Sequence, residues 1–168
     1  MILNLKDIFL CEGSVMKKEL LQDMSDVNFS GVKPFVAPVS VDVTAENRAG
    51  LVKLSLATSF NFQKPCDRCG TDVNREFHYN FEHYPVTSLS GDQNDDYIET
   101  PDYTIDIDEL VRDDILLELP SKYLCSNECK GLCPKCGKNL NLGRCGCGKE
   151  IDPRFAVLEQ LLDRDPGK

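Results

Sequence analysis

Residues 35–63 have the sequence FVAPVSVDVTAENRAGLVKLSLATSFNFQ, in which apolar and polar side chains alternate. A period of two is typical of β-strands with one face in a core and the other in water. The apolar positions are odd-numbered before a turn at 46–50 and even-numbered after it: Ala37, Val39, Val41, Val43, Ala45, Val52, Leu54, Leu56, Phe60 and Phe62. A third segment continues the alternation with Val73, Phe77, Tyr79 and Phe81. We therefore predict an antiparallel meander over residues 35–86.

The segments before and after the meander are less regular. Residues 2–10 are a plausible fourth strand, and residues 17–24 have the composition of a short helix. Residues 87–102 are polar and rich in turn-forming side chains, which predicts a mobile loop.

Two helices are predicted in the C-terminal half. Asp106 is a suitable N-cap with Glu109 three residues later, and Pro120 closes the segment. Asp152 and Pro153 begin a last helix, with a proline at its first position. Each helix has an apolar stripe that the sheet would bury; the stripes are Ile107, Leu110, Val111, Ile115 and Leu119, and then Phe155, Leu158, Leu161 and Leu162.

The nine cysteines are an odd number, which excludes complete disulfide pairing. The first residues have no basic region, and Lys6 and Asp7 interrupt their apolar run, so we expect no signal peptide and a cytoplasmic location. No stretch approaches the roughly 18 apolar residues of a membrane span. In a reducing compartment cysteines stay as thiols or bind metal, so their spacing becomes the informative feature.

The turn between the second and third strands contains Cys66-Asp-Arg-Cys69-Gly70. A two-residue gap brings both sulfurs to one ion, and the glycine can adopt the positive φ of a tight turn. A redox C-x-x-C motif would instead be expected where a strand leads into a helix. One such pair supplies half of a metal site.

A second cluster places six cysteines within residues 125–147, among glycines that leave little room for an apolar core. We predict two four-sulfur sites that each hold a structural zinc ion, Cys66, Cys69, Cys125 and Cys129 in one, and Cys133, Cys136, Cys145 and Cys147 in the other. In the alternative grouping, one site consists of Cys125, Cys129, Cys133 and Cys136, and the other consists of Cys66, Cys69, Cys145 and Cys147. An iron–sulfur cluster is the other metal chemistry for such a set. Cys11 remains, and we expect it to be a buried small apolar residue.

Motifs for catalysis are missing. His78 and His83 fall on opposite faces of the third strand, and no phosphate loop or metalloprotease motif is present. We expect no enzymatic activity. The rival hypotheses are a ribosomal RNA processing nuclease, a thiol redox protein that uses Cys66 and Cys69, and a zinc regulator that binds nucleic acid.

The charge distribution suggests a protein partner. The net charge is −9, which disfavours unspecific binding to phosphates. Residues 92–118 contain eleven acidic side chains and one basic side chain, Arg112. Such a surface either serves solubility or attracts a basic partner, such as a ribosomal protein. Residues 124–149 reverse this balance, with Lys130, Lys135, Lys138, Arg144 and Lys149 against Glu128, and could contact RNA.

Several of these segments together resemble the YceD-like family, the family of the large ribosomal RNA subunit accumulation protein. They are Cys66–Gly70, residues 107–120, residues 129–137, Asn139-Leu-Asn141 and Asp152-Pro-Arg-Phe155. The resemblance implies a bacterial protein that supports accumulation or processing of 23S ribosomal RNA, encoded near a small, basic large-subunit ribosomal protein. It supplies no catalytic residue.

We therefore predict an α+β fold, with an antiparallel sheet and one or two packing helices. Its expected parts are a sheet domain with a closing helix at 1–120, a zinc-stapled module at 121–151 and a C-terminal helix at 152–168. The predicted function is that of a ribosome-biogenesis factor whose partners are a basic large-subunit ribosomal protein, the 23S ribosomal RNA precursor, or both.

Overall fold

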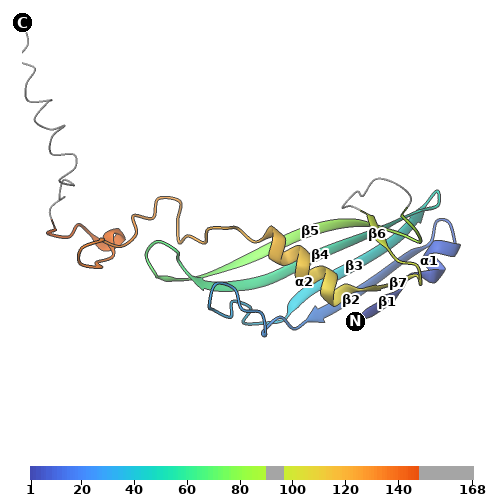
Figure 1. The fold of residues 1–168 in the computed structure, drawn as a ribbon, viewed down its shortest axis with the longest axis horizontal. Coiled ribbons are helices and arrows are strands. Elements are labelled where there is room, and N and C mark those ends of the chain that lie inside the picture. The colour runs from blue at the N-terminus through green and yellow to red at the C-terminus, as the bar shows by residue number, and fades with distance from the viewer. Residues whose placement is uncertain (90–96, 148–168) are drawn as a thin grey trace, which may run out of the picture.

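Two long antiparallel strands, joined by the turn that carries Cys66 and Cys69, form the centre of the fold (Figure 1). The computed structural model describes residues 1–89 and 97–147. In chain order its elements are β1 Ile2–Asn4, α1 Lys6–Leu10, β2 Val15–Gln22, β3 Val39–Arg48, β4 Leu51–Pro65, β5 Asp72–Val86, β6 Tyr97–Glu99, β7 Thr104–Asp106, α2 Ile107–Glu118 and the 3-10 turn η1 Leu140–Leu142.

The main sheet has the strand order β2-β3-β4-β5-β6. Strands β2 to β5 are antiparallel neighbours, as the predicted meander requires, whereas β6 runs parallel to β5. β1 and β7 form a separate antiparallel pair. The fold is thus α+β with a mixed main sheet. No helix in the described ranges has the length and apolar character needed to cross a membrane.

The predicted inward face of the strands is confirmed, except that Ala37 is exposed and lies ahead of β3. Val43 pairs with Leu56, and Leu56 pairs with Phe81, so the three side chains lie on the same face of the sheet. Apolar residues at alternate positions of β3 and β4 are buried, while the residues between them are half-buried or exposed. The buried set is Val39, Val41, Val43, Ala45, Val52, Leu54, Leu56, Phe60 and Phe62.

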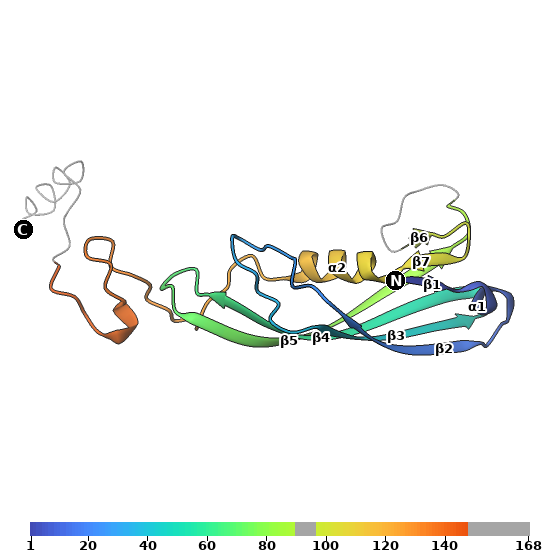
Figure 2. The same cartoon turned by 90° about the horizontal axis from the view of Figure 1, so that it is seen from below.

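Helix α2 covers this apolar face, on the same side of the sheet as β1 and β7 (Figure 2). It begins after Asp106, whose side chain accepts a hydrogen bond from the backbone N–H of Asp108, and it ends before Pro120, as predicted. Ile107, Val111 and Ile115 are its buried residues. Their four-residue spacing matches one face of a helix.

The N-terminal segment differs from the single strand predicted over residues 2–10. Only Ile2–Asn4 forms a strand, β1, which pairs with β7. The chain then turns into α1, and Leu5 and Ile8 are buried in the core. Their spacing of three residues points both side chains the same way in a helix but to opposite faces in a strand.

The helix predicted over residues 17–24 is wrong. Residues Val15–Gln22 form β2, which pairs along its whole length with β3. Lysine, glutamate and leucine favour helices only by fractions of a kcal/mol, and pairing with an available sheet edge overrides that preference. The predicted loop at 87–102 contains a short strand, β6. The helix predicted from Asp152 lies outside the described residues, and the division into domains stays a prediction.

We expect Ile115→Ala to lower the free energy of unfolding by about 2–5 kcal/mol, because Ile115 has no exposed surface and the truncation leaves a cavity between α2 and the sheet. The matched control is Leu117→Ala on the same helix. Leu117 is 85% exposed, and its truncation should change the stability by no more than about 0.5 kcal/mol. Urea unfolding measures both changes, and equal effects would contradict the packing of α2.

Candidate metal centres

The first cysteine tetrad joins the β4–β5 turn to the chain that follows α2. Cys66 and Cys69 come from the turn, and Cys125 and Cys129 come from the later segment. The Sγ atoms of Cys66 and Cys129 are 3.8 Å apart, and those of Cys69 and Cys125 are 3.6 Å apart. Three of the four residues are buried, and Cys125 is half-buried.

The second tetrad is local in sequence and more open. It consists of Cys133, Cys136, Cys145 and Cys147, with the Sγ atoms of Cys133 and Cys145 3.4 Å apart. Cys136 and Cys147 are exposed, and only Cys133 is buried. In each tetrad all four sulfur atoms lie within 4.8 Å of one another.

The eight sulfurs are therefore grouped as the sequence analysis favoured, and the alternative grouping is not formed. Both tetrads could hold metal ions. Cys11, expected to be buried, is instead exposed at the C-terminal end of α1. The chain turns outward there, so that cysteine lies outside the core and outside both tetrads.

Each tetrad begins with the same backbone turn. The N–H of Gly70 donates to the carbonyl of Cys66, and the N–H of Gly137 donates to the carbonyl of Cys133, both at 2.9 Å. Both glycines have φ = 70°, in the left-handed region that favours glycine. These turns direct the two sulfurs of each C-x-x-C pair to one side.

Partly buried polar contacts hold the first tetrad against the sheet. Asp67 forms an ion pair with Lys64 and accepts a hydrogen bond of 2.6 Å from the backbone N–H of Tyr123. The Tyr123 ring is buried, its hydroxyl donates to the carbonyl of Phe62 at 2.8 Å, and Arg75 lies over its face at 5.4 Å. The segment that supplies Cys125 is thus anchored just before it reaches the metal site.

The two tetrads are also linked to each other by polar contacts. Asn141 donates to the Sγ of Cys129 at 3.3 Å and accepts from the N–H of Lys130 at 2.8 Å. Arg68 donates to the carbonyl of Cys129 at 3.0 Å. A Cβ atom at Gly131 would lie 3.1 Å from the carbonyl oxygen of Arg68, so this close approach favours glycine. Asn141, which lies between the cysteine pairs of the second tetrad, therefore contacts a cysteine of the first.

Sequence reasoning assigned no role to Asp67, Tyr123 or Asn141. The signal that could have found Asn141 is its place in the Asn139-Leu-Asn141 run between two cysteine pairs. Tyr123, a large aromatic residue just ahead of Cys125, was a candidate for packing. Nothing in the local pattern indicates that Asp67 contacts a residue 56 positions away.

The thiols of each tetrad titrate unequally. Burial raises the pKa of Cys66. Backbone N–H groups that donate to its sulfur, of which that of Cys125 has the largest effect, outweigh burial and lower the pKa to about 6. Hydrogen bonding with Cys129 raises the pKa of Cys125 to about 12. In the second tetrad, backbone N–H groups lower the pKa of Cys133 to about 6, and hydrogen bonding to a neighbouring thiol raises that of Cys147 to about 12. Four ionised sulfurs at this distance need a cation to neutralise them.

Within the described residues, no other histidine, cysteine or carboxylate side chains converge as a possible metal site. The cysteine tetrads are the only sets of three or more ligand atoms that meet within residues 1–89 and 97–147. His83 contacts Asp114 of α2 at 2.8 Å, and His78 lies on the opposite, exposed face near Glu76.

The fold and its sites define the class: an α+β protein whose C-terminal part is organised by two cysteine tetrads that could hold metal. A family model described as "Large ribosomal RNA subunit accumulation protein YceD" matches residues 54–162, which include most of β4, all of β5 and α2, and all eight cysteines of the tetrads. The chain belongs to the YceD family, as its sequence motifs indicated.

Relatives support this assignment. The protein YlbN of Bacillus subtilis (strain 168), described as uncharacterized, is 30% identical over 163 residues, which cover 95% of this chain and 91% of YlbN. The chloroplastic "Large ribosomal RNA subunit accumulation protein YCED homolog 1" of Arabidopsis thaliana is 41% identical over 61 residues, 36% of this chain and 19% of the plant protein. A protein of the same name from Zea mays is 42% identical over 66 residues. No solved structure matches the chain.

We expect Asp67→Asn to lower the free energy of unfolding at neutral pH by about 1–2 kcal/mol, because it removes the charge that pairs with Lys64 and weakens the contact with Tyr123. The Lys64 ammonium and then the Tyr123 N–H hold the pKa of Asp67 below its usual value, so the carboxylate is charged at neutral pH. The control is Asp72→Asn, at an exposed position in the same hairpin. Equal losses in thermal or urea unfolding would contradict a specific role of Asp67.

Proposed function

We propose that each tetrad holds one structural zinc ion. The donor set supports zinc, because four thiolates in closed turns suit a tetrahedral ion with no open coordination position. Tetrahedral geometry with zinc–sulfur bonds of about 2.3 Å places sulfurs about 3.8 Å apart. The separations of 3.8, 3.6 and 3.4 Å between sulfur pairs are close to that value. Zinc would supply folding energy here rather than activate a substrate.

The protein so organised is, in our proposal, not an enzyme. A catalytic zinc would need an open position, and each tetrad offers four cysteines. A thiol redox pair at Cys66 and Cys69 is disfavoured because Cys125 and Cys129 contact the same two sulfurs. A metal-dependent nuclease is disfavoured because no carboxylate group of three converges in the described residues.

The biological role that we propose is support of 23S ribosomal RNA accumulation during ribosome assembly in the bacterial cytoplasm. The observation that carries it is the family match over residues 54–162, which spans the sheet hairpin, α2 and both tetrads. The plant relatives are named for accumulation of the large ribosomal RNA subunit. The proposal transfers that role to this chain.

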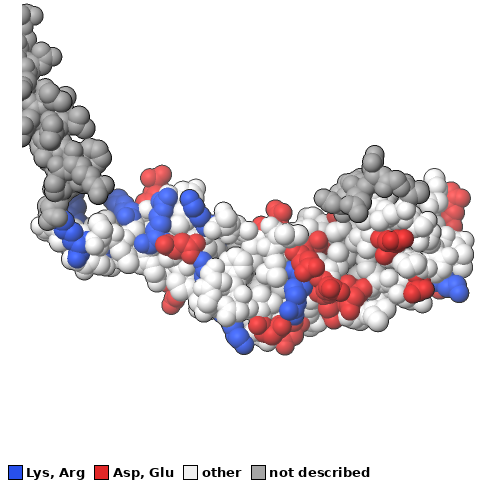
Figure 3. Space-filling model, in the orientation of Figure 1, with Lys and Arg blue, Asp and Glu red and all other residues white. Residues whose placement is uncertain are grey.

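Charge separation supports two kinds of contact. Acidic side chains gather over α2 and the adjoining strands, and basic side chains gather at the cysteine-rich end (Figure 3). The acidic end would attract a basic large-subunit ribosomal protein, and the basic end would contact the 23S ribosomal RNA precursor. Four thiolates around one zinc ion carry a net charge of about −2, which limits how strongly the basic end attracts phosphate.

Zinc release should occur in two steps. The second tetrad has two exposed cysteines, whereas the first is largely buried. We therefore expect a chromogenic chelator to remove one equivalent quickly and the second slowly. Cys136→Ser should abolish the fast phase, and Cys69→Ser the slow one. A single phase from the intact protein, or no zinc in metal analysis, would contradict the assignment.

The proposed function predicts a specific defect in cells. Loss of the protein should lower the amount of 23S ribosomal RNA relative to the small-subunit RNA. The wild-type gene should restore the ratio, and Cys66→Ser with Cys129→Ser should fail to do so because the first tetrad is broken. Cys11→Ser is the matched control, since Cys11 is exposed and outside both tetrads. An unchanged RNA ratio in the deletion strain would overturn the proposal.

A further inference from the structure

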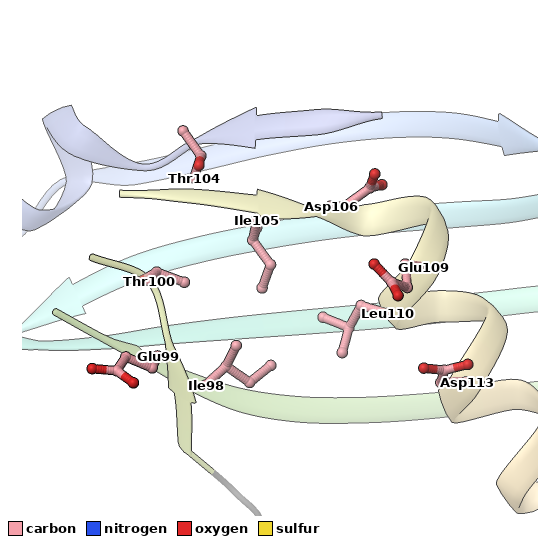
Figure 4. Close-up of a pocket in the computed structure, with 9 residues that line it drawn as sticks. All are labelled: Ile98, Glu99, Thr100, Thr104, Ile105, Asp106, Glu109, Leu110 and Asp113. Atoms are coloured by element: carbon pink, nitrogen blue, oxygen red, sulfur yellow. The ribbon is translucent and has the colours of Figure 1, made fainter. Parts of the chain in front are cut away.

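A groove lies between α2, β6 and β7, at the opposite end of the sheet from the cysteine tetrads (Figures 1 and 4). Its volume is about 390 Å³. Ile98, Ile105 and Leu110 project toward one another and form an apolar floor (Figure 4). The lining also includes the carboxylate residues Glu99, Asp106, Glu109 and Asp113, of which Glu99 points away from Ile98 (Figure 4).

Within the described residues, three of these carboxylates form no ion pair with a basic side chain. Asp106 caps α2 and contacts the amino group of Met1. The side chains of Glu99, Glu109 and Asp113 form no hydrogen bond or ion pair in the part of the chain that the structure describes. Arg112, the one basic residue of α2, is paired with Asp26 at 3.1 Å and is not part of the groove lining. The groove therefore presents uncompensated negative charge around an apolar surface.

The separation of these carboxylates indicates which cation would fit. In the described residues only the cysteine tetrads bring three or more ligand atoms within 4.8 Å of one another, so the groove does not form a chelating site for a small ion. A lysine or arginine side chain combines an aliphatic stem with a terminal charge, and it can cover apolar surface while its head reaches a carboxylate of the lining.

We propose that this groove is the docking site for a lysine- and arginine-rich segment of a protein partner. The inference rests on the proposed function, because it assigns the site at which a basic ribosomal protein would bind. Apolar stems of the segment would lie on Ile98, Ile105 and Leu110, and its charged ends would pair with Glu109 and Asp113 of α2. Asp114, by contrast, is engaged with His83 beneath the helix and takes no part.

The test uses the full-length, zinc-loaded protein and a capped, fluorescent peptide of alternating lysine and glycine. We expect binding that weakens with added salt, and methyl NMR shifts that are largest at Ile98, Ile105 and Leu110. The double variant Glu109→Gln with Asp113→Asn should weaken the affinity about tenfold or more. It keeps the shape of both side chains, so a normal thermal unfolding curve separates lost binding from lost structure.

The matched control is Glu118→Gln, which neutralises an exposed carboxylate on the same helix outside the groove lining. It should leave the affinity within about twofold. The docking site would be overturned if the control weakened binding equally or if the methyl shifts were located elsewhere. It would also be overturned if the double variant left peptide binding unaffected. If the groove binds the peptide while deletion leaves the 23S RNA ratio unchanged, the proposed function fails and the site stands. If deletion lowers the 23S RNA ratio but the groove does not bind the peptide, the docking site is wrong and the proposed function stands.

Discussion

Convergence of four sulfur atoms at the tip of the β4–β5 hairpin is the constraint on which the C-terminal part of the described chain depends. The cluster around them contains Cys66, Cys69 and Cys129, with little apolar surface besides Val73 and Leu124. The main core, in contrast, is an ordinary apolar layer between the sheet and α2. One half of the molecule is thus held by burial of hydrocarbon, and the other by cysteine side chains and the polar contacts that orient them.

Much of the architecture could be predicted because it follows from local regularity. Alternation in β3 and β4 identified the buried face residue by residue, and Asp106 with Pro120 located both ends of α2. The secondary-structure predictions failed where tertiary contacts determine the conformation of a segment. Residues Val15–Gln22 have a helix-forming composition but pair with β3. The chain forms α1 after β1 because the side chains of Leu5 and Ile8 are both buried in the core, which lies on one side of this segment only. Cys11 is exposed because the chain turns outward after that helix.

The tetrads illustrate the same division. Spacing of the cysteines indicated which sulfurs share a turn, since each C-x-x-C-Gly segment adopts the same hydrogen-bonded geometry. The contacts of Asp67 with Tyr123 and of Asn141 with Cys129 join positions 56 and 12 residues apart, and each occurs once. Single polar contacts of this kind carry no periodic signal, so only the assembled structure reveals them. The groove between α2, β6 and β7 is likewise formed by elements that meet only in three dimensions.

The two tetrads close chain segments of very different length, and if both hold zinc, as we propose, this difference orders the two binding events during synthesis. Cys69 and Cys125 are 56 residues apart, whereas Cys133 and Cys145 are 12 residues apart. Closing the longer segment from a random chain costs about 1.4 kcal/mol more in entropy. The sheet hairpin and α2 remove that cost by holding the ends together beforehand. The first tetrad would therefore bind metal only after the sheet hairpin and α2 have folded. The second would bind metal as soon as its own short segment has left the ribosome. A nascent chain with a damaged sheet would keep the ion of the second tetrad and lose the ion of the first.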